Sequence, residues 1–148
     1  MTILNIEDIK DIIPHREDML LVDRITIKDN SNVIGEYKVR GTEYFLSGHF
    51  PSNPIVPGVI LCEMMAQACC GFAYGCENKF LPFLVKIDKM KFKHIVVPGD
   101  NVIFNCILIS NKRNVMKIEG NAVVKDKVAL IGSMTFLLTG SNGGKITK

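Results

Sequence analysis

The chain has 148 residues, of which 47% are hydrophobic and 22% are charged, so it is large enough to form one domain around its own core. Its formal net charge is only +3, and aromatic residues make up 7% without any Trp, which argues against a nucleic-acid-binding protein. Residues 1–12 contain no basic stretch leading into an apolar run, so we expect an intracellular, cytoplasmic protein with no membrane association.

The first predicted helix covers residues 6–13, where isoleucines recur with the spacing of one helical face and Pro14 ends the pattern. Two strands are expected next, at residues 20–28 and 33–40, and the polar turn residues between them predict a hairpin. After a loop rich in Gly and Pro, residues 58–76 form a long apolar stretch.

The rest of the chain is strand-like. Strands are predicted at residues 83–92, 101–109, 115–124 and 128–138, with turns at 98–100, 111–114 and 125–127. One long helix among about six strands, most of them joined by hairpins, indicates an antiparallel α+β fold. We expect residues 1–140 to form a single domain and the polar, Gly-rich residues 141–148 to form a disordered tail.

Four of the five cysteines lie within residues 62–76. If this stretch is helical, Cys62 and Cys69 are about 10 Å apart along the helix axis, which is too far for a disulfide. No Cys or His spacing is typical of a zinc site. The cysteines are therefore expected to be reduced thiols packed in the core.

The segment PGVILCEMMAQACCGFAYGC is the most informative part of the sequence. Pro57 suits the first position of a helix and Gly75 suits its exit. Between them the residues are apolar or small on all sides except for Glu63 and Gln67, so we expect a helix buried on every side and enclosed by a curved sheet. A membrane span is the alternative, but Glu and Gln are costly in the middle of such a span.

Glu63 is unusual in these apolar surroundings. Burial penalises an ionised carboxylate, so we expect the pKa of Glu63 to be raised. Gln67 lies one turn further and shares its face of the helix. Two interpretations stay open: a structural Glu that is satisfied by Gln67 and backbone donors, or a protonatable general acid in a dry site.

His49 lies in the segment SGHFPSNPIVPG, which runs directly into this helix. Gly48 and three prolines restrict the loop, so the imidazole can be held in one place without surrounding secondary structure. The other two histidines, His15 and His94, are expected to have structural or surface roles.

The segment HFPSNPIVPGVILCEMMAQ resembles the motif of the FabZ family, the (3R)-hydroxyacyl-[acyl-carrier-protein] dehydratases of type II fatty acid biosynthesis. That motif has the form G-H-F-P-x-x-P-x-x-P-G-V-x-x-x-E-x-M-A-Q. The segments IPHREDMLLVDRI and IDKMKFKHIVVPGD are also similar to the family, and the resemblance extends over residues 13–138.

The resemblance implies a hot-dog fold, in which an antiparallel sheet wraps a long central helix. It also implies that the protein dehydrates a (3R)-hydroxyacyl thioester to the trans-2-enoyl thioester, with His49 as general base and Glu63 as general acid. The family builds each site at a homodimer interface, with His from one subunit and the acid from the other, and commonly assembles as a trimer of dimers. The expected partner is acyl carrier protein with the 3-hydroxyacyl group on its phosphopantetheine arm.

Further site residues are expected around this pair. The backbone N–H of Gly58, in the first turn of the helix, is suited to bind the thioester carbonyl, and Gln67 is suited to orient Glu63. Phe83 occupies a place where relatives often carry a tunnel-gating Tyr, so it is a candidate substrate-binding residue. The reaction is expected to need no metal or organic cofactor.

The sequence also departs from the family pattern. Glu17, Asp18 and Met19 stand where an aromatic-Pro-Phe run is common, and Met64 replaces the usual Ala after the acid. These differences leave the preferred acyl chain length open.

Three lysines, Lys89, Lys91 and Lys93, alternate along a predicted strand and should share one face, opposite Met90 and Phe92. This basic stripe is either a docking surface for an acidic carrier protein or an ordinary solvated strand face.

Three other functions remain as alternatives on the same fold. A thioesterase would use the acid to activate water and would not need His49. A dehydratase–isomerase would typically carry Asp in place of Glu63. A non-catalytic acyl-thioester sensor would have no reason to keep both residues.

Overall fold

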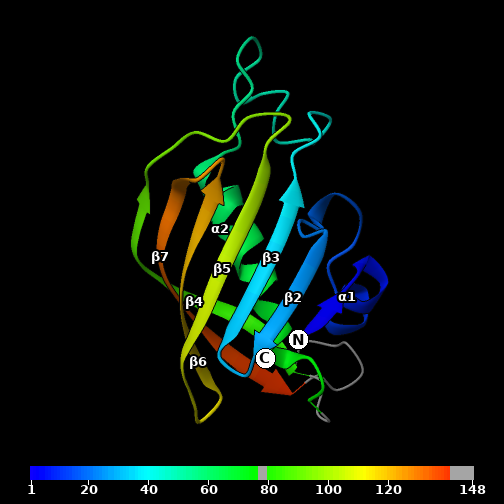
Figure 1. Cartoon of the computed structure of the whole chain (residues 1–148), viewed down its shortest axis with the longest axis vertical. Coiled ribbons are helices and arrows are strands. Elements are labelled where there is room, and N and C mark those ends of the chain that lie inside the picture. The colour runs from blue at the N-terminus through cyan, green and yellow to red at the C-terminus, as the bar shows by residue number, and fades with distance from the viewer. Residues whose placement is uncertain (77–79, 141–148) are drawn as a thin grey trace.

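The computed structural model describes residues 1–76 and 80–140, and it contains a seven-stranded sheet packed around one central helix (Figure 1). The helices are α1 (Ile6–Ile12) and α2 (Gly58–Ala68), with 3₁₀ turns at Glu17–Met19 and Cys69–Ala73. The strands are β1 (Thr2–Leu4), β2 (Arg24–Asp29), β3 (Asn32–Lys38), β4 (Phe80–Phe92), β5 (Asn101–Lys112), β6 (Val115–Val124) and β7 (Lys127–Gly140). The predicted disordered tail, residues 141–148, lies outside the described residues.

The sheet has the order β1-β2-β3-β5-β6-β7-β4, and every neighbouring pair of strands is antiparallel. The predicted α+β class is confirmed, with one strand more than the six expected. Strand β6 has the predicted bounds because two tight turns delimit it. Both turns, Arg113-Asn114 and Lys125-Asp126, have positive φ angles, as hairpin turns of this kind require.

The N-terminal region differs from the prediction in two places. Strand β1, which pairs with β2, was not anticipated. Residues 20–23 were expected to begin the first strand, but β2 begins only at Arg24. The backbone N–H of Leu21 donates to the side chain of Gln67 at 2.8 Å, so Leu21 bonds to helix α2, and the bonds to β3 begin only with the Asp23 N–H, which donates to the Glu36 carbonyl at 2.8 Å.

Helix α2 lies behind β2, β3 and β5 in the view of Figure 1, with the strongly curved sheet around it. The contact with the sheet is close enough to require glycine. A Cβ atom at Gly35 of β3 would overlap Ala68 of α2, and one at Gly120 of β6 would lie 2.9 Å from the sulfur of Met65. Met64, which stands where the family usually has Ala, is fully buried in the same core.

One expectation for this helix is wrong. We expected burial on every side, but Val59 is 74% exposed, and Ile60, Glu63 and Ala66 are only partly buried. The sheet of a single chain covers one side of α2 and leaves this stripe uncovered. In the described residues, no helix combines the length and the apolar character that a membrane crossing needs.

All five cysteines are free, as expected, but only four of them are buried. Cys76 is exposed, so the expectation of five core cysteines is wrong at this position. The α-helix ends earlier than the apolar pattern, because the chain tightens into a 3₁₀ turn where Gly71 packs against Ile25 and Val33. Cys76 follows the positive-φ residue Gly75, where the chain turns out of the core.

Candidate active site

His49 lies in the loop between β3 and α2. Figure 1 shows this loop at the end of the molecule drawn uppermost. Two hydrogen bonds tie it to Ile55: the Ile55 N–H donates to the His49 carbonyl at 2.8 Å, and His49 Nδ1 lies 2.9 Å from the Ile55 carbonyl. Since a carbonyl oxygen can only accept, Nδ1 must carry the hydrogen. In the neutral ring, Nε2 therefore keeps its lone pair and can accept a proton.

A pocket of about 480 Å³ adjoins this imidazole. It is lined mainly by apolar groups, and its walls include His49, Gly58, Phe92 and His94. Gly58 is the first residue of α2, and a Cβ atom there would lie 2.7 Å from the Phe92 ring. The loop and the helix start are held against the neighbouring segment by a bond from the Val56 N–H to the Val96 carbonyl at 2.8 Å.

Glu63 lies further along α2, in a different cluster. Its Oε1 atom accepts a hydrogen bond from Gln67 Nε2 at 2.8 Å and lies 3.2 Å from His15 Nε2. The bond from His15 is the largest influence on the carboxyl and lowers the pKa of Glu63, and the Gln67 bond acts in the same direction against the opposing effect of burial. The expectation that burial would raise this pKa is therefore wrong.

Gln67 is only 2% exposed, and its side chain links α2 to the segment before β2. Its Nε2 also donates to the Met19 carbonyl at 2.7 Å, while its Oε1 accepts from the Leu21 N–H. These contacts determine which end of the amide is oxygen and which is nitrogen. The expected proximity of Gln67 and Glu63 is present in the structure.

The contact of His15 with Glu63 was missed by the sequence analysis, which assigned His15 a structural or surface role. His15 follows α1 in the segment IPHREDMLLVDRI. The similarity of this segment to the family was the one signal that could have marked His15 as a site residue. Nothing in the spacing of the residues links His15 to Glu63, because the two are far apart in the chain and meet only when the N-terminal segment packs on α2.

The two clusters are separate within one chain. In residues 1–76 and 80–140, no hydrogen bond or ion pair joins His49 to Glu63, and Glu63 does not line the pocket of His49. Gly58 and Glu63 are about 7.5 Å apart along the helix axis. The uncovered Val59 lies between them, one turn before Glu63 on the same face of α2.

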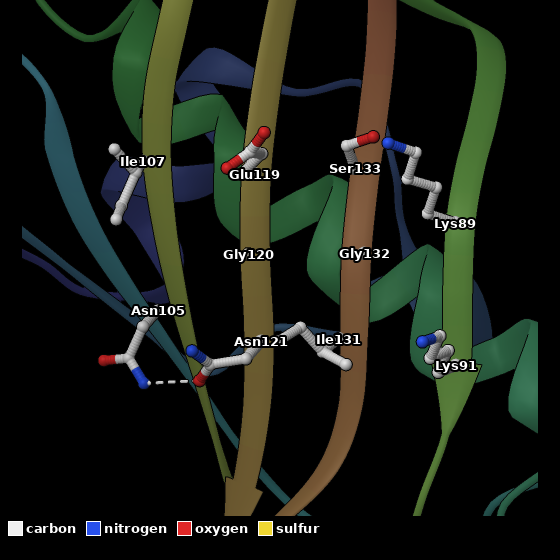
Figure 2. A pocket seen from close by; sticks show the side chains of 10 residues that line it. All are labelled: Lys89, Lys91, Asn105, Ile107, Glu119, Gly120, Asn121, Ile131, Gly132 and Ser133. Atoms are coloured by element: carbon white, nitrogen blue, oxygen red, sulfur yellow. Dashed lines mark hydrogen bonds between the residues drawn. The ribbon is translucent and has the colours of Figure 1, made fainter.

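The remaining candidates lie on β4. Phe83 pairs with Leu137 of β7 and is not among the residues that line the His49 pocket. Lys89 and Lys91 line a shallow hollow of about 350 Å³, and Figure 2 shows them on the face of the sheet that is turned away from α2. Met90 packs toward the core, so the predicted opposite faces are confirmed for these residues. Lys93 follows the end of β4 and is exposed.

Within the part of the chain that the structure describes, no group of three or more His, Cys, Asp or Glu side chains could hold a metal ion. The chemical groups present are an imidazole with a free Nε2, backbone amides at a helix start, and a carboxyl with two N–H neighbours. Together, such groups can move protons and stabilise an anion at a carbonyl oxygen.

A family model described as a FabA-like domain matches residues 13–132. The chain is also similar to curated proteins named 3-hydroxyacyl-[acyl-carrier-protein] dehydratase FabZ. The protein from Thermoanaerobacter pseudethanolicus is 39% identical over 137 residues, which cover 90% of this chain and 96% of that protein. The protein from Caldicellulosiruptor bescii is 40% identical over 138 residues, which cover 90% of this chain and 98% of that protein.

Solved structures show the same hot-dog fold at low sequence identity. A dehydratase heterocomplex from Xenorhabdus doucetiae has a TM-score of 0.76 and 17% identity, and the match covers 90% of this chain and 91% of that one. A mutant thioesterase from Pseudomonas aeruginosa has a TM-score of 0.69 and 12% identity, and the match covers 93% and 96%. These likenesses confirm the expected fold.

Proposed function

Because this chain belongs to the FabA-like family, we propose that it dehydrates (3R)-hydroxyacyl-[acyl-carrier-protein] to the trans-2-enoyl form in type II fatty acid biosynthesis. It is a hydro-lyase, like the curated dehydratases it is similar to. The observation that carries the proposal is a loop histidine with a free Nε2, held beside the first amide of α2 in an apolar pocket.

The reaction needs two proton transfers. A base must remove a weakly acidic proton from the carbon next to the thioester carbonyl, and an acid must protonate the hydroxyl that leaves as water. As the carbon–hydrogen bond breaks, negative charge develops on the thioester oxygen, and N–H donors aimed at that oxygen stabilise it. The elimination itself calls for no metal or organic cofactor.

In the proposed mechanism, His49 is the base. Its Nδ1–H is engaged by the Ile55 carbonyl, which keeps the ring oriented and leaves Nε2 to take the proton. The backbone N–H of Gly58 is proposed to bind the thioester oxygen, because Gly58 lines the same pocket at the positive end of the α2 dipole. The absence of a side chain at Gly58 leaves room for the Phe92 ring that forms the pocket wall.

Glu63 is the proposed acid, supplied by a second copy of the chain. Its pKa is lowered in the single chain, where this stripe of α2 is uncovered, and burial in the subunit interface is proposed to raise that pKa so that the carboxyl holds a proton. Two features support a site shared between subunits: the separation of the His49 and Glu63 clusters within one chain, and the uncovered stripe of α2 that carries Val59 and Glu63. A homodimer that covers this stripe would bring each Glu63 toward the other subunit's His49. Further assembly into a trimer of dimers is part of the same proposal.

The proposed partner is acyl carrier protein, which would present the 3-hydroxyacyl group on its phosphopantetheine arm. Phe83 is proposed to contact the acyl chain, and its place on β4, away from the His49 pocket, means that such a contact would involve the far end of a long chain or the partner subunit's pocket.

The direct test is incubation of the purified full chain with 3-hydroxyacyl-carrier substrates of several lengths, followed by mass analysis. Loss of one water, with the thioester intact, is the expected result. Release of free carrier thiol would instead identify a thioesterase, and a shifted double bond would identify a dehydratase–isomerase. A protein that binds these substrates and leaves all of them unchanged would overturn the proposed activity.

A further inference from the structure

The two donors that approach Glu63 both reach the same oxygen. Gln67 Nε2 is 2.8 Å and His15 Nε2 is 3.2 Å from Oε1, while Oε2 has no hydrogen-bond partner among the described residues. We propose that His15 is a positioning residue: together with Gln67 it occupies Oε1, so that the proton which Glu63 gives to the leaving hydroxyl resides on Oε2. This inference rests on the proposed function, because it assigns a role within the same site.

The protonation of both neighbours follows from their contacts. A carboxylate oxygen can only accept hydrogen bonds, so Nε2 of His15 must carry a hydrogen. The other ring nitrogen, Nδ1, is buried and has no hydrogen-bond partner in residues 1–76 and 80–140, which suits a lone pair better than an N–H. The Gln67 amide is oriented by Met19 and Leu21, so its nitrogen faces Oε1. An oxygen that accepts the Gln67 N–H and lies 3.2 Å from His15 Nε2 is a poor place for a proton.

The backbone on both sides of the His15 side chain is held from outside the cluster by Arg16. The Arg16 guanidinium donates to the backbone carbonyls of Ile13 at 2.8 Å, His15 at 2.7 Å and Lys10 at 2.9 Å. These bonds fasten the segment between α1 and β2 on one side of His15, and the Leu21–Gln67 bond fastens it on the other. The imidazole is therefore placed before any substrate arrives, as a positioning residue must be.

The proton balance of the step is complete with these groups. His49 takes the proton from the carbon next to the thioester, and the freed electron pair forms the new carbon–carbon double bond. The carbon–oxygen bond breaks as Oε2 of Glu63 gives its proton to the hydroxyl, which leaves as water. Glu63 is then a carboxylate, and the N–H groups of His15 and Gln67 stabilise its charge. The proton on His49 returns to Glu63 through solvent.

Within the described part of a single chain, His15 is the one titratable side chain that contacts Glu63. In the proposed dimer the other subunit's His49 would also face this carboxyl, in the parent chain and in the His15 variants alike. Gln67 is neutral, Arg16 is turned toward backbone carbonyls, and Glu17 and Asp18 line a separate hollow beside α1. A change in the titration of Glu63 after replacement of His15 can therefore be assigned to this one contact.

The test compares His15→Ala with His15→Gln, whose side-chain amide can place an N–H near the original Nε2. We expect His15→Ala to raise the pKa of Glu63, measured by carbon-13 NMR of the labelled carboxyl, and to lower kcat about tenfold with little change in KM. His15→Gln should bring both the pKa of Glu63 and kcat most of the way back to their values in the parent chain. Glu7→Gln is the matched control: it removes only the exposed ion pair with Lys10 on α1, so the Glu63 titration should stay close to that of the parent chain. Arg16→Ala should shift the Glu63 titration in the same direction as His15→Ala but less, because it loosens the segment that places His15.

The inference would be overturned by an unchanged Glu63 titration in folded His15→Ala, or by a His15→Gln variant no better than His15→Ala in both measurements. The titration needs no substrate, so it is separate from the test of the proposed function. If folded Glu63→Gln keeps full activity, the acid assignment fails, and the NMR result still reports whether His15 holds Oε1.

Discussion

The His49 pocket adjoins the start of helix α2, the Glu63 cluster lies further along the same helix, and the two are built in different ways. His49 is positioned by the backbone of its own loop, through the two bonds with Ile55. Glu63 is positioned by side chains from a distant segment, through His15 and Gln67. The first arrangement depends on local chain geometry and the second on tertiary packing, so substitutions should affect stability very differently in the two regions.

The largest expected effect on activity is in the local region. His49→Ala should lower kcat about a thousandfold, because the general base is lost, while the free energy of unfolding changes little at this partly exposed site. His49→Asn sharpens the comparison, since its amide can still donate to the Ile55 carbonyl but cannot act as a base. Steady-state kinetics and thermal unfolding of both variants are the measurements. Substantial activity in His49→Asn would break the assignment.

The largest expected effect on stability is in the tertiary region. Gln67→Leu removes the partners of the buried Leu21 N–H and the Met19 carbonyl, so it should lower the free energy of unfolding by about 2 kcal/mol. Denaturant titration measures this loss. Asn105→Leu is the control: it also removes a side-chain amide bond, to Asn121, but on the outer face of the sheet, and should cost less than about 1 kcal/mol.

A smaller effect is expected from pH. The folded chain lowers the pKa of Glu63, so the fold gains stability from the ionised carboxylate above the unfolded pKa of about 4.3, and loses it as pH falls through the lower folded value. Glu63→Gln should therefore show a shallower loss of stability in this acid range. Glu119→Gln, at an exposed position outside both regions, should keep the parent slope. Equal slopes in all three proteins would contradict the His15–Glu63 contact.

The smallest effect is expected outside both regions, on the outer face of the sheet. If Lys89 and Lys91 dock the carrier protein, their joint replacement by Glu should raise KM for a carrier-linked substrate about two- to fivefold. A short thioester analogue should keep its KM, because it makes no contact with this face. Equal changes for both substrates would remove the docking role and leave these lysines as a solvated strand face.

The site was predicted from the sequence only in part. The motif and the Pro-rich loop marked His49 and Glu63, and helical spacing placed Gln67 beside Glu63, because all of this information is local. The predicted rise in the pKa of Glu63 was wrong because it considered burial alone. The hydrogen bond that reverses the direction comes from His15, which no local pattern connects to α2.

The fold, like the site, was predicted where it depends on local sequence and not where it depends on tertiary packing. Apolar periodicity and turn residues determine the class of fold, the course of β6 and the identity of the central helix, since these depend on neighbours a few residues apart. Which face of α2 is covered depends on the reach and curvature of the sheet. The apolar pattern of the sequence does not distinguish a helix face that the chain itself covers from one that it leaves uncovered. Only the packed structure distinguishes Val59 from Met64, and it does so because burial is a property of surfaces that meet and not of the order of residues along the chain.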